Sequence, residues 1–159
     1  MTIAIGCDEA GFELKEKVKE YLQCKCFEVE DYGVYDTNPI MYPDIAIKVA
    51  EAIAEGKHER GILICGTGIG MAIAANKVHG VRAAVCHDPY SAERARKSND
   101  AQILAFGARI IGFNLASLLL DTWLNSEFQG GSSFQKVKKI GEYEDRIVGS
   151  TSKVNDNVV

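Results

Sequence analysis

One segment of the chain combines a reactive side chain with a run of backbone N–H groups. It begins at Cys65, after an apolar β-branched run, and continues as Gly66, Thr67, Gly68, Ile69 and Gly70. Glycines allow a sharp turn that presents consecutive N–H groups, and such groups favour negative charge. A thiol in front of them can act as a thiolate base or nucleophile. The segment could bind a phosphate or nucleotide, hold an oxyanion beside a cysteine base, or simply form a tight turn.

Two nucleotide-binding motifs can be compared with this segment. The phosphate loop that ends in Gly-Lys-Ser/Thr is absent, and the G-x-G-x-x-G fingerprint has Met71 in place of its third glycine. Asp88 stands roughly where an acidic ribose contact would be sought. Nucleotide binding is therefore weakened by the residues but not excluded by them.

Other polar side chains also follow apolar runs. Asp8 and Glu9 come after the first run, where a carboxylate pair could orient sugar hydroxyls, or one of them could cap the next helix. His87 and Asp88 follow a later run and could be an acid–base pair, although a solvated loop fits equally well. The basic stretch 94–97 is short and is interpreted as a solvated helix face.

The elements that must position these residues alternate along the chain. Apolar, often β-branched runs predict strands at 2–7, 27–31, 60–65, 81–86 and 101–106. Amphipathic stretches predict helices at 12–22, 44–55, 71–77, 91–97, 115–124 and 134–147. This alternation predicts βαβ units and a parallel sheet, whose ligands bind beyond the carboxyl ends of the strands. Residues 1–148 are expected to form a single domain, and 149–159 a loose tail.

The composition limits the class of protein. The 159 residues include 18 Lys and Arg against 22 Asp and Glu, and the pI near 5.4 gives no support for nucleic acid or an anionic membrane as partner. Neither a signal peptide nor a membrane span is recognisable, so a cytoplasmic location is expected. The five cysteines are an odd number and are expected to be thiols. Cys24 and Cys26 have neither a second pair nor a nearby histidine, so zinc is not expected there.

Several segments taken together resemble the ribose-5-phosphate isomerase B family, which also contains galactose-6-phosphate and allose-6-phosphate isomerases. They are GCDEAGFELK, the Tyr42-Pro43 step, RGILICGTGIGMAIAANK, GVRAAVC, Asn99-Asp100 and LAFGARIIG, spread over residues 3–147. The resemblance implies an α/β fold, a Rossmann-like three-layer αβα sandwich with a five-stranded parallel sheet. It also implies a sugar phosphate as ligand, no metal and no cofactor, and a homodimer or dimer of dimers with active sites between subunits.

The resemblance further implies a reaction. The family interconverts an aldose phosphate and a ketose phosphate through an enediol(ate), and ribose 5-phosphate and ribulose 5-phosphate are the pair expected first. In one branch the base is a cysteine at the strand end, which falls on Cys65. In the other branch it is a glutamate within the glycine segment, where this chain has Met71.

The expected contacts with the substrate follow from the same resemblance. The backbone of Gly66–Gly70 and the Thr67 hydroxyl would hold the oxyanion. Asp8 and Asn99 would bind sugar oxygens, and Arg109 falls on a position that contacts substrate.

Four positions depart from the pattern of that family. Glu9 stands where a histidine is usual, and Ser98 stands where the family has the histidine credited with opening the furanose ring. Ser132 and Lys136 replace two arginines that grip the phosphate. Three interpretations follow: an isomerase of another sugar or sugar phosphate, a sugar-binding or heteromeric subunit that is not catalytic alone, or a weak ribose-5-phosphate isomerase with His87 as substitute acid.

Overall fold

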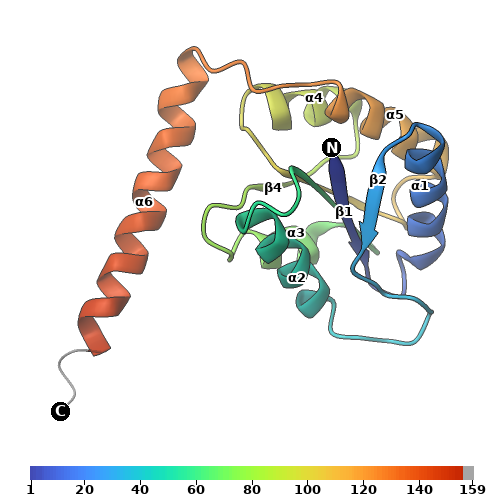
Figure 1. Cartoon of the computed structure of the whole chain (residues 1–159), viewed down its shortest axis with the longest axis horizontal. Coiled ribbons are helices and arrows are strands. Elements are labelled where there is room, and N and C mark those ends of the chain that lie inside the picture. Colours follow the sequence, from blue (N-terminus) through green and yellow to red (C-terminus); the bar gives the residue numbers. More distant parts are fainter. Residues whose placement is uncertain (156–159) are drawn as a thin grey trace.

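The computed structural model describes residues 1–155, in which strands and helices alternate along the chain (Figure 1). The strands are β1 (Thr2–Cys7), β2 (Glu28–Asp31), β3 (Arg60–Cys65), β4 (Ala83–Val85) and β5 (Ile103–Gly107). The helices are α1 (Phe12–Cys24), α2 (Tyr42–Ala54), α3 (Ile69–Ala75), α4 (Pro89–Lys97), α5 (Phe113–Leu124) and α6 (Ser132–Asn155). All predicted elements are present, and the largest difference is the end of α6, which lies beyond the predicted residue 147. Helices α2 and α3 begin slightly earlier than predicted, because Pro43 fits the first turn of α2 and α3 begins directly after Gly68.

The strands form one parallel sheet in the order β2-β1-β3-β5-β4. Helices α1, α4 and α5 pack together on one face of the sheet, and α2 and α3 cover the other face (Figure 1). The predicted fold class, a Rossmann-like three-layer αβα sandwich with a five-stranded parallel sheet, is confirmed. Of the described helices, none is both long and apolar enough to cross a membrane.

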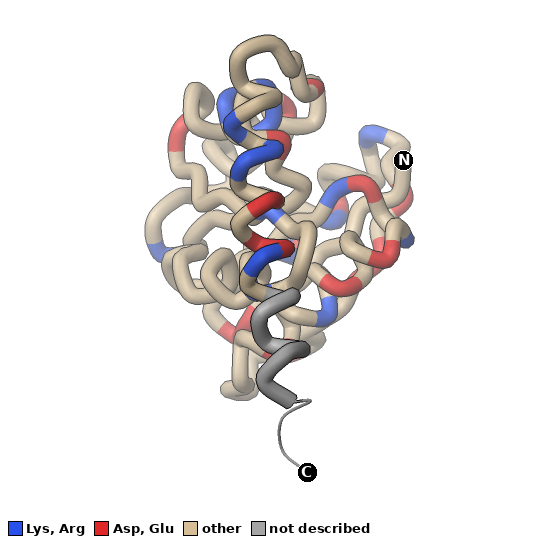
Figure 2. Tube along the Cα trace, turned by 90° about the vertical axis from the view of Figure 1, so that its left-hand side faces the viewer, with Lys and Arg blue, Asp and Glu red and all other residues tan. Residues whose placement is uncertain are grey.

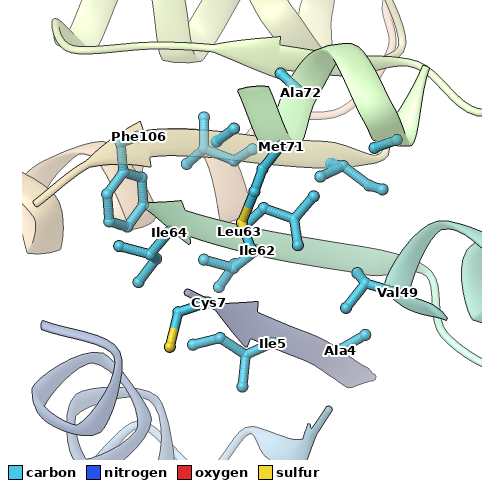
Figure 3. Close-up of a cluster of buried hydrophobic side chains, with 14 of the residues drawn as sticks. Ala4, Ile5, Cys7, Val49, Ile62, Leu63, Ile64, Met71, Ala72 and Phe106 are labelled. Atoms are coloured by element: carbon cyan, nitrogen blue, oxygen red, sulfur yellow. The ribbon is translucent and has the colours of Figure 1, made fainter. Parts of the chain in front are cut away.

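The core lies between the sheet and the helices on both of its faces. Every residue of β3 and β5 is buried, as expected for central strands that helices cover on both sides. Figure 3 shows strand side chains such as Ile5 and Ile62 beside Val49 of α2 and Met71 of α3. This packing fixes the strand ends relative to one another, and the polar residues that follow the strands are fixed with them.

Helix α6 stands apart from the sandwich, on the side of the loop between α3 and β4 (Figure 1). It follows Gly130 and Gly131, both with positive φ, and Figure 2 shows lysines in its first turns ahead of acidic residues. Large apolar side chains on it are half or more exposed: Phe134, Ile140, Tyr143 and Ile147. Its backbone is helical through Asn155, so the segment 149–155 of the expected loose tail is helix, and 156–159 lie outside the described residues.

Candidate active site

Three of the residues predicted to do chemistry, Asp8, Cys65 and Arg109, lie at the carboxyl edge of the sheet. From β1 the chain moves outward to β2 and then returns past β1 to β3, so the direction of winding reverses between β1 and β3. Open α/β sheets bind ligands at such a reversal, beyond the strand ends. Asp8 follows β1 and donates its N–H to the Ile64 carbonyl at 3.1 Å, which places it beside Cys65 at the end of β3.

Cys65 is held by the glycine segment that follows it. Its side chain is 6% exposed, and the sulfur accepts the Gly68 N–H at an N···S distance of 3.0 Å. Gly68 has φ +79°, and a Cβ on it would lie 2.9 Å from the Phe106 backbone, so both conformation and space require glycine. A backbone N–H directed at the sulfur is a contact that negative charge on a thiolate would accept.

Three other buried side chains near this edge, those of Cys7, Cys86 and Met71, belong to the core. Burial raises the pKa of Cys7 to about 12 and that of Cys86 to about 11, so both remain protonated thiols at neutral pH. Met71, at the position where one branch of the family is expected to carry a glutamate, is fully buried and packs into the core (Figure 3). Met71 therefore leaves Cys65 as the candidate base in this segment.

The loops after β3 and β5 interlock around the glycine segment. Ala108 donates its N–H to the Cys65 carbonyl at 2.8 Å, and Arg109 donates to the Gly66 carbonyl at 3.1 Å. The Arg109 side chain lies against Gly66, where an added Cβ would be 3.5 Å from its guanidinium carbon. Thr67 is exposed, and its hydroxyl accepts the Ile69 N–H at 3.4 Å. These contacts keep the predicted oxyanion-binding backbone, Gly66 to Gly70, in one conformation.

The two carboxylates after β1 have different partners. Asp8 is 9% exposed, and its Oδ1 accepts the Gly11 N–H at 3.0 Å. Burial raises the pKa of Asp8, the Gly11 N–H opposes this, the neighbouring Glu9 charge adds to it, and Arg109 lowers it; the pKa is raised overall. Glu9 Oε2 accepts the Ile40 N–H at 3.4 Å and so contacts the loop before α2.

His87 lies at the same edge, after β4. Its Nε2 is 3.0 Å from the Gly107 nitrogen. Because a backbone N–H can only donate, Nε2 accepts and the ring proton of a neutral imidazole is on Nδ1. The role of His87 as substitute acid stays a prediction, and the proton for it would come from Nδ1.

Ser98 and Asn99 lie at the opposite, amino edge of the sheet. They follow α4 and precede β5, and the Asn99 carbonyl accepts from Arg82 at 3.2 Å. Gly107, the last residue of β5, pairs with Cys65, so four strand steps of about 3.3 Å, or about 13 Å, separate the two edges. One chain therefore does not bring these two predicted residues to its own Cys65.

Ser132 and Lys136 also lie away from Cys65. Both are exposed in the first two turns of α6, which has left the sandwich at that point (Figure 1). The contacts that tie α6 to the body come later: Asp145 pairs with His79 at 2.8 Å, and Glu144 accepts the Gly80 N–H at 3.1 Å. Both contacts are at the loop between α3 and β4.

Three residues of the carboxyl edge received no site role from sequence reasoning. An added Cβ on Gly11 would lie 2.4 Å from the Ile64 carbonyl oxygen, and one on Gly107 would lie 2.6 Å from Thr67 Cα. The Tyr42 ring lies so close to Gly70 that an added Cβ would be 2.7 Å from its Cζ. Gly107 directly follows a predicted strand, which is a signal for such a close approach, whereas the Tyr42 contact spans 28 residues and has no local signal.

Comparison with known proteins identifies the family to which this chain belongs. A family model described as Ribose/Galactose Isomerase matches residues 3–140. The chain belongs to the ribose/galactose isomerase family. The resemblance to ribose-5-phosphate isomerase B that the sequence motifs indicated is thereby confirmed. In the part of the chain that the structure describes, no three His, Cys, Asp or Glu side chains are grouped to hold a metal ion.

Relatives within the ribose/galactose isomerase family carry names with different sugars. A D-erythrulose-4-phosphate isomerase of Pectobacterium atrosepticum is 58% identical over 91% of this chain and 95% of that protein. A ribose-5-P isomerase B of Listeria innocua is 56% identical over 92% of this chain and 99% of that protein. The solved structure of Clostridium thermocellum ribose-5-phosphate isomerase B is 49% identical, with a TM-score of 0.91 over 92% of this chain and 99% of that chain. The chain is an isomerase of sugar phosphates by this likeness.

Proposed function

We propose that the protein interconverts an aldose phosphate and a ketose phosphate through an enediolate, with the Cys65 thiolate as base. The observation that carries the proposal is the Gly68 N–H donated to Cys65 Sγ at 3.0 Å, at the start of a run of backbone donors. Ribose 5-phosphate and ribulose 5-phosphate are the first substrate pair, supported by the names of the Listeria and Clostridium relatives.

The proton path follows from the position of the sulfur. The thiolate takes the proton from C2, and the C–H electron pair forms the C1=C2 double bond while the carbonyl oxygen O1 becomes negative. A proton then passes from O2 to O1, and the Cys65 thiol returns its proton to C1, which yields the ketose. Backbone N–H groups of Gly66–Gly70 stabilise the negative oxygen in the intermediate. Asp8 and Arg109, which flank the segment, orient the sugar.

A second copy of the chain completes the site. Within one chain, Ser98, Asn99 and Lys136 do not reach Cys65, which is what a site between two subunits requires. Exposed apolar side chains on α3 support such an interface, because Ile69 and Ile73 next to the site are 53% and 58% exposed. We expect a homodimer, or a dimer of dimers, in size-exclusion chromatography with light scattering. A monomer with full turnover would contradict this arrangement.

The mechanism is tested on Cys65. We expect Cys65→Ala to lose ketose formation from ribose 5-phosphate while its melting temperature stays close to that of the wild type. Cys86→Ala is the matched control, because it removes a second buried thiol at the same edge and should keep turnover. The wild type should exchange the C2 proton with deuterated solvent. Turnover by Cys65→Ala at the wild-type rate would rule out the proposed base.

D-erythrulose 4-phosphate is a second candidate substrate, which the name of the Pectobacterium relative favours. All three histidines of the chain have partners: His58 with Tyr32, His79 with Asp145, and His87 with Gly107. A tetrose 4-phosphate carries its phosphate on the oxygen that would close a furanose ring. Such a substrate is open-chain and needs no ring-opening acid, which agrees with Ser98 in place of a histidine.

A substrate panel separates these candidates. kcat/KM is measured for ribose 5-phosphate, D-erythrulose 4-phosphate, allose 6-phosphate and galactose 6-phosphate. Preference for ribose 5-phosphate supports the first pair, and preference for D-erythrulose 4-phosphate supports the second. Saturable binding of a sugar phosphate without turnover would instead identify a binding subunit that needs a different partner chain.

A further inference from the structure

The chain makes a strained corner between α4 and β5. Ser98 caps the C-terminus of α4, Asn99 is exposed, and Asp100 has φ +49°. A positive φ is uncommon for a residue with a side chain, although Asp tolerates it better than most. The conformation of this corner therefore depends on contacts from outside it.

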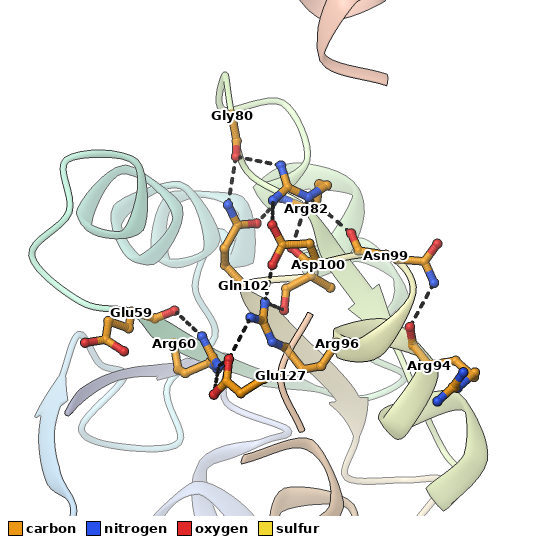
Figure 4. Close-up of polar contacts among 11 residues, drawn as sticks. Glu59, Arg60, Gly80, Arg82, Arg94, Arg96, Asn99, Asp100, Gln102 and Glu127 are labelled. Carbon is orange, nitrogen blue, oxygen red and sulfur yellow. Dashed lines mark hydrogen bonds and ion pairs between the residues drawn. The ribbon is translucent and has the colours of Figure 1, made fainter. Parts of the chain in front are cut away.

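Arg82 holds the corner from the segment that precedes β4. Its Nε donates to the carbonyl oxygens of Asn99 at 3.2 Å and Asp100 at 3.0 Å. Its Nη2 donates to Asp100 Oδ2 at 2.8 Å (Figure 4). One guanidinium thus fixes two consecutive carbonyl groups and a side chain of the corner.

Arg96 holds the same corner from α4. The sequence interpretation of a solvated helix face is wrong for this residue, whose exposure is only 4%. Its Nη1 donates to the Ala101 carbonyl and pairs with Asp100 Oδ1, both at 3.0 Å (Figure 4). The Asp100 carboxylate therefore lies between two guanidinium groups, and the backbone on each side of it accepts from one of them.

Arg96 also connects the corner to the segment from which α6 departs. Its Nη2 is 3.6 Å from Glu127 Oε2, and Arg60 Nη2 donates to both Glu127 oxygens at 3.0 and 3.1 Å (Figure 4). Close by, Gln129 donates its N–H to the Lys97 carbonyl at 3.1 Å. The corner and the segment 127–129, which precedes α6, are thus tied to one network.

Two arginines of this network are buried, and burying a charged group costs free energy. Arg60 and Arg96 are about nineteen-twentieths buried, and their Nε atoms have no hydrogen-bond partner among the described residues. Their carboxylate partners are less buried, because the side chains of Asp100 and Glu127 are 30% and 78% exposed. Replacing buried charged groups by apolar residues is often neutral or stabilising, so we explain these arginines by the geometry they impose. Of these two arginines only Arg96 reaches the corner, where its Nη1 contacts the Ala101 carbonyl and the Asp100 carboxylate.

We propose that Arg96 and Arg82 are positioning residues, which fix the Ser98–Asn99 corner so that Asn99 meets the sugar in the site of the second subunit. The inference rests on the proposed function, in which Asn99 binds a sugar oxygen. Neither arginine touches the substrate. Arg82 acts through the backbone of Asn99 and Asp100, and Arg96 acts through Asp100 and the Ala101 carbonyl.

Kinetics on the full-length protein test the inference. Arg96→Met roughly keeps the length of the side chain and removes the guanidinium group. We expect its kcat/KM to fall about tenfold to a hundredfold, as a misplacement of about 1 Å does. Arg96→Lys keeps the charge without the guanidinium group, and its kcat/KM should lie between those of Arg96→Met and the wild type. Lys97→Met is the matched control on the same helix, because among the described residues its side chain pairs with Glu93 and not with the corner, and it should keep wild-type kinetics.

A hybrid dimer separates positioning from folding. A Cys65→Ala chain and an Arg96→Met chain with different tags are co-expressed and purified together. If the corner serves the partner's site, one site combines an intact Cys65 with an intact corner, and the hybrid recovers about half the turnover of the wild-type dimer, which has two equivalent sites. A merely destabilised subunit would not recover activity in this way.

The outcomes are distinct. Wild-type kcat/KM in Arg96→Met, or no recovery in the hybrid, overturns the positioning inference. If Arg96→Met does not fold, Arg82→Met is taken through the same two measurements with the same expected results. Full turnover by the Cys65→Ala homodimer would overturn the proposed function instead, so the two failures cannot be confused.

Discussion

Replacing Gly68 by alanine tests whether close packing holds its N–H against the Cys65 sulfur. The left-handed conformation, φ +79°, costs an L-residue about 1–2 kcal/mol. The new Cβ would lie 2.9 Å from the Phe106 backbone, which cannot move aside without shifting β5, and overpacking of this kind costs about 1–3 kcal/mol. We therefore expect Gly68→Ala to lower the free energy of unfolding by about 2–5 kcal/mol.

The same substitution should lower turnover, because relief of the clash moves the N–H away from the sulfur. A hydrogen bond to a charged group is worth about 1.5–3 kcal/mol, so its loss corresponds to a fall in kcat of about tenfold to a hundredfold. Gly56→Ala is the matched control. Gly56 has φ +73° with nothing within 4 Å of an added Cβ, so Gly56→Ala has the conformational cost of a positive φ but no steric clash.

Both quantities are accessible in the full-length protein. Urea unfolding can be followed by the fluorescence of Trp123, the single tryptophan, which is fully buried in α5. Turnover is measured as ketose formation from ribose 5-phosphate. Equal losses of stability in the two variants, or wild-type kcat in Gly68→Ala, would refute the reasoning from close packing.

Further predictions concern groups away from the glycine segment. Lys15 is fully buried, and its Nζ lies 2.8 Å from Asp31 Oδ2, so Lys15→Met should cost about 3 kcal/mol in urea unfolding; a loss under 1 kcal/mol would contradict this. Burial raises the pKa of Asp31, but Lys15 and Lys19 outweigh it and hold the pKa below its usual value. The lowered pKa of Asp31 therefore contributes stability above about pH 4, and this contribution is lost as the pH falls through the folded-state pKa. We expect the urea midpoint to decline less between pH 6 and pH 3 in Lys15→Met than in the wild type, because the variant lacks one of the two lysines that lower this pKa. At pH 8, iodoacetamide should label the exposed cysteines at the end of α1 and leave Cys7 and Cys86, with pKa values of about 12 and 11, unlabelled by mass spectrometry.

The sequence predicted the elements and one edge of the sheet well, because both depend on local patterns. Apolar runs marked the strands, and the rule that ligands bind beyond strand ends placed Asp8 beside Cys65. The other edge could not be predicted this way. Ser98 and Asn99 follow a helix, and their distance from Cys65 depends on the length and register of β5. Arg96 belongs to a basic stretch that is typical of a solvent-exposed helix face, and only the packing of α4 against its neighbours shows that Arg96 is buried.

The separation of the predicted site over opposite edges of one sheet has an evolutionary consequence. With the proposed site between two subunits, one copy can lose its base after a gene duplication and the other copy its corner, and a mixed pair still keeps one complete set. Each copy then depends on the other, and reversal needs a specific mutation in one of them. An enzyme arranged in this way can pass from a self-sufficient pair of identical chains to an obligate pair of different chains without an inactive stage in between.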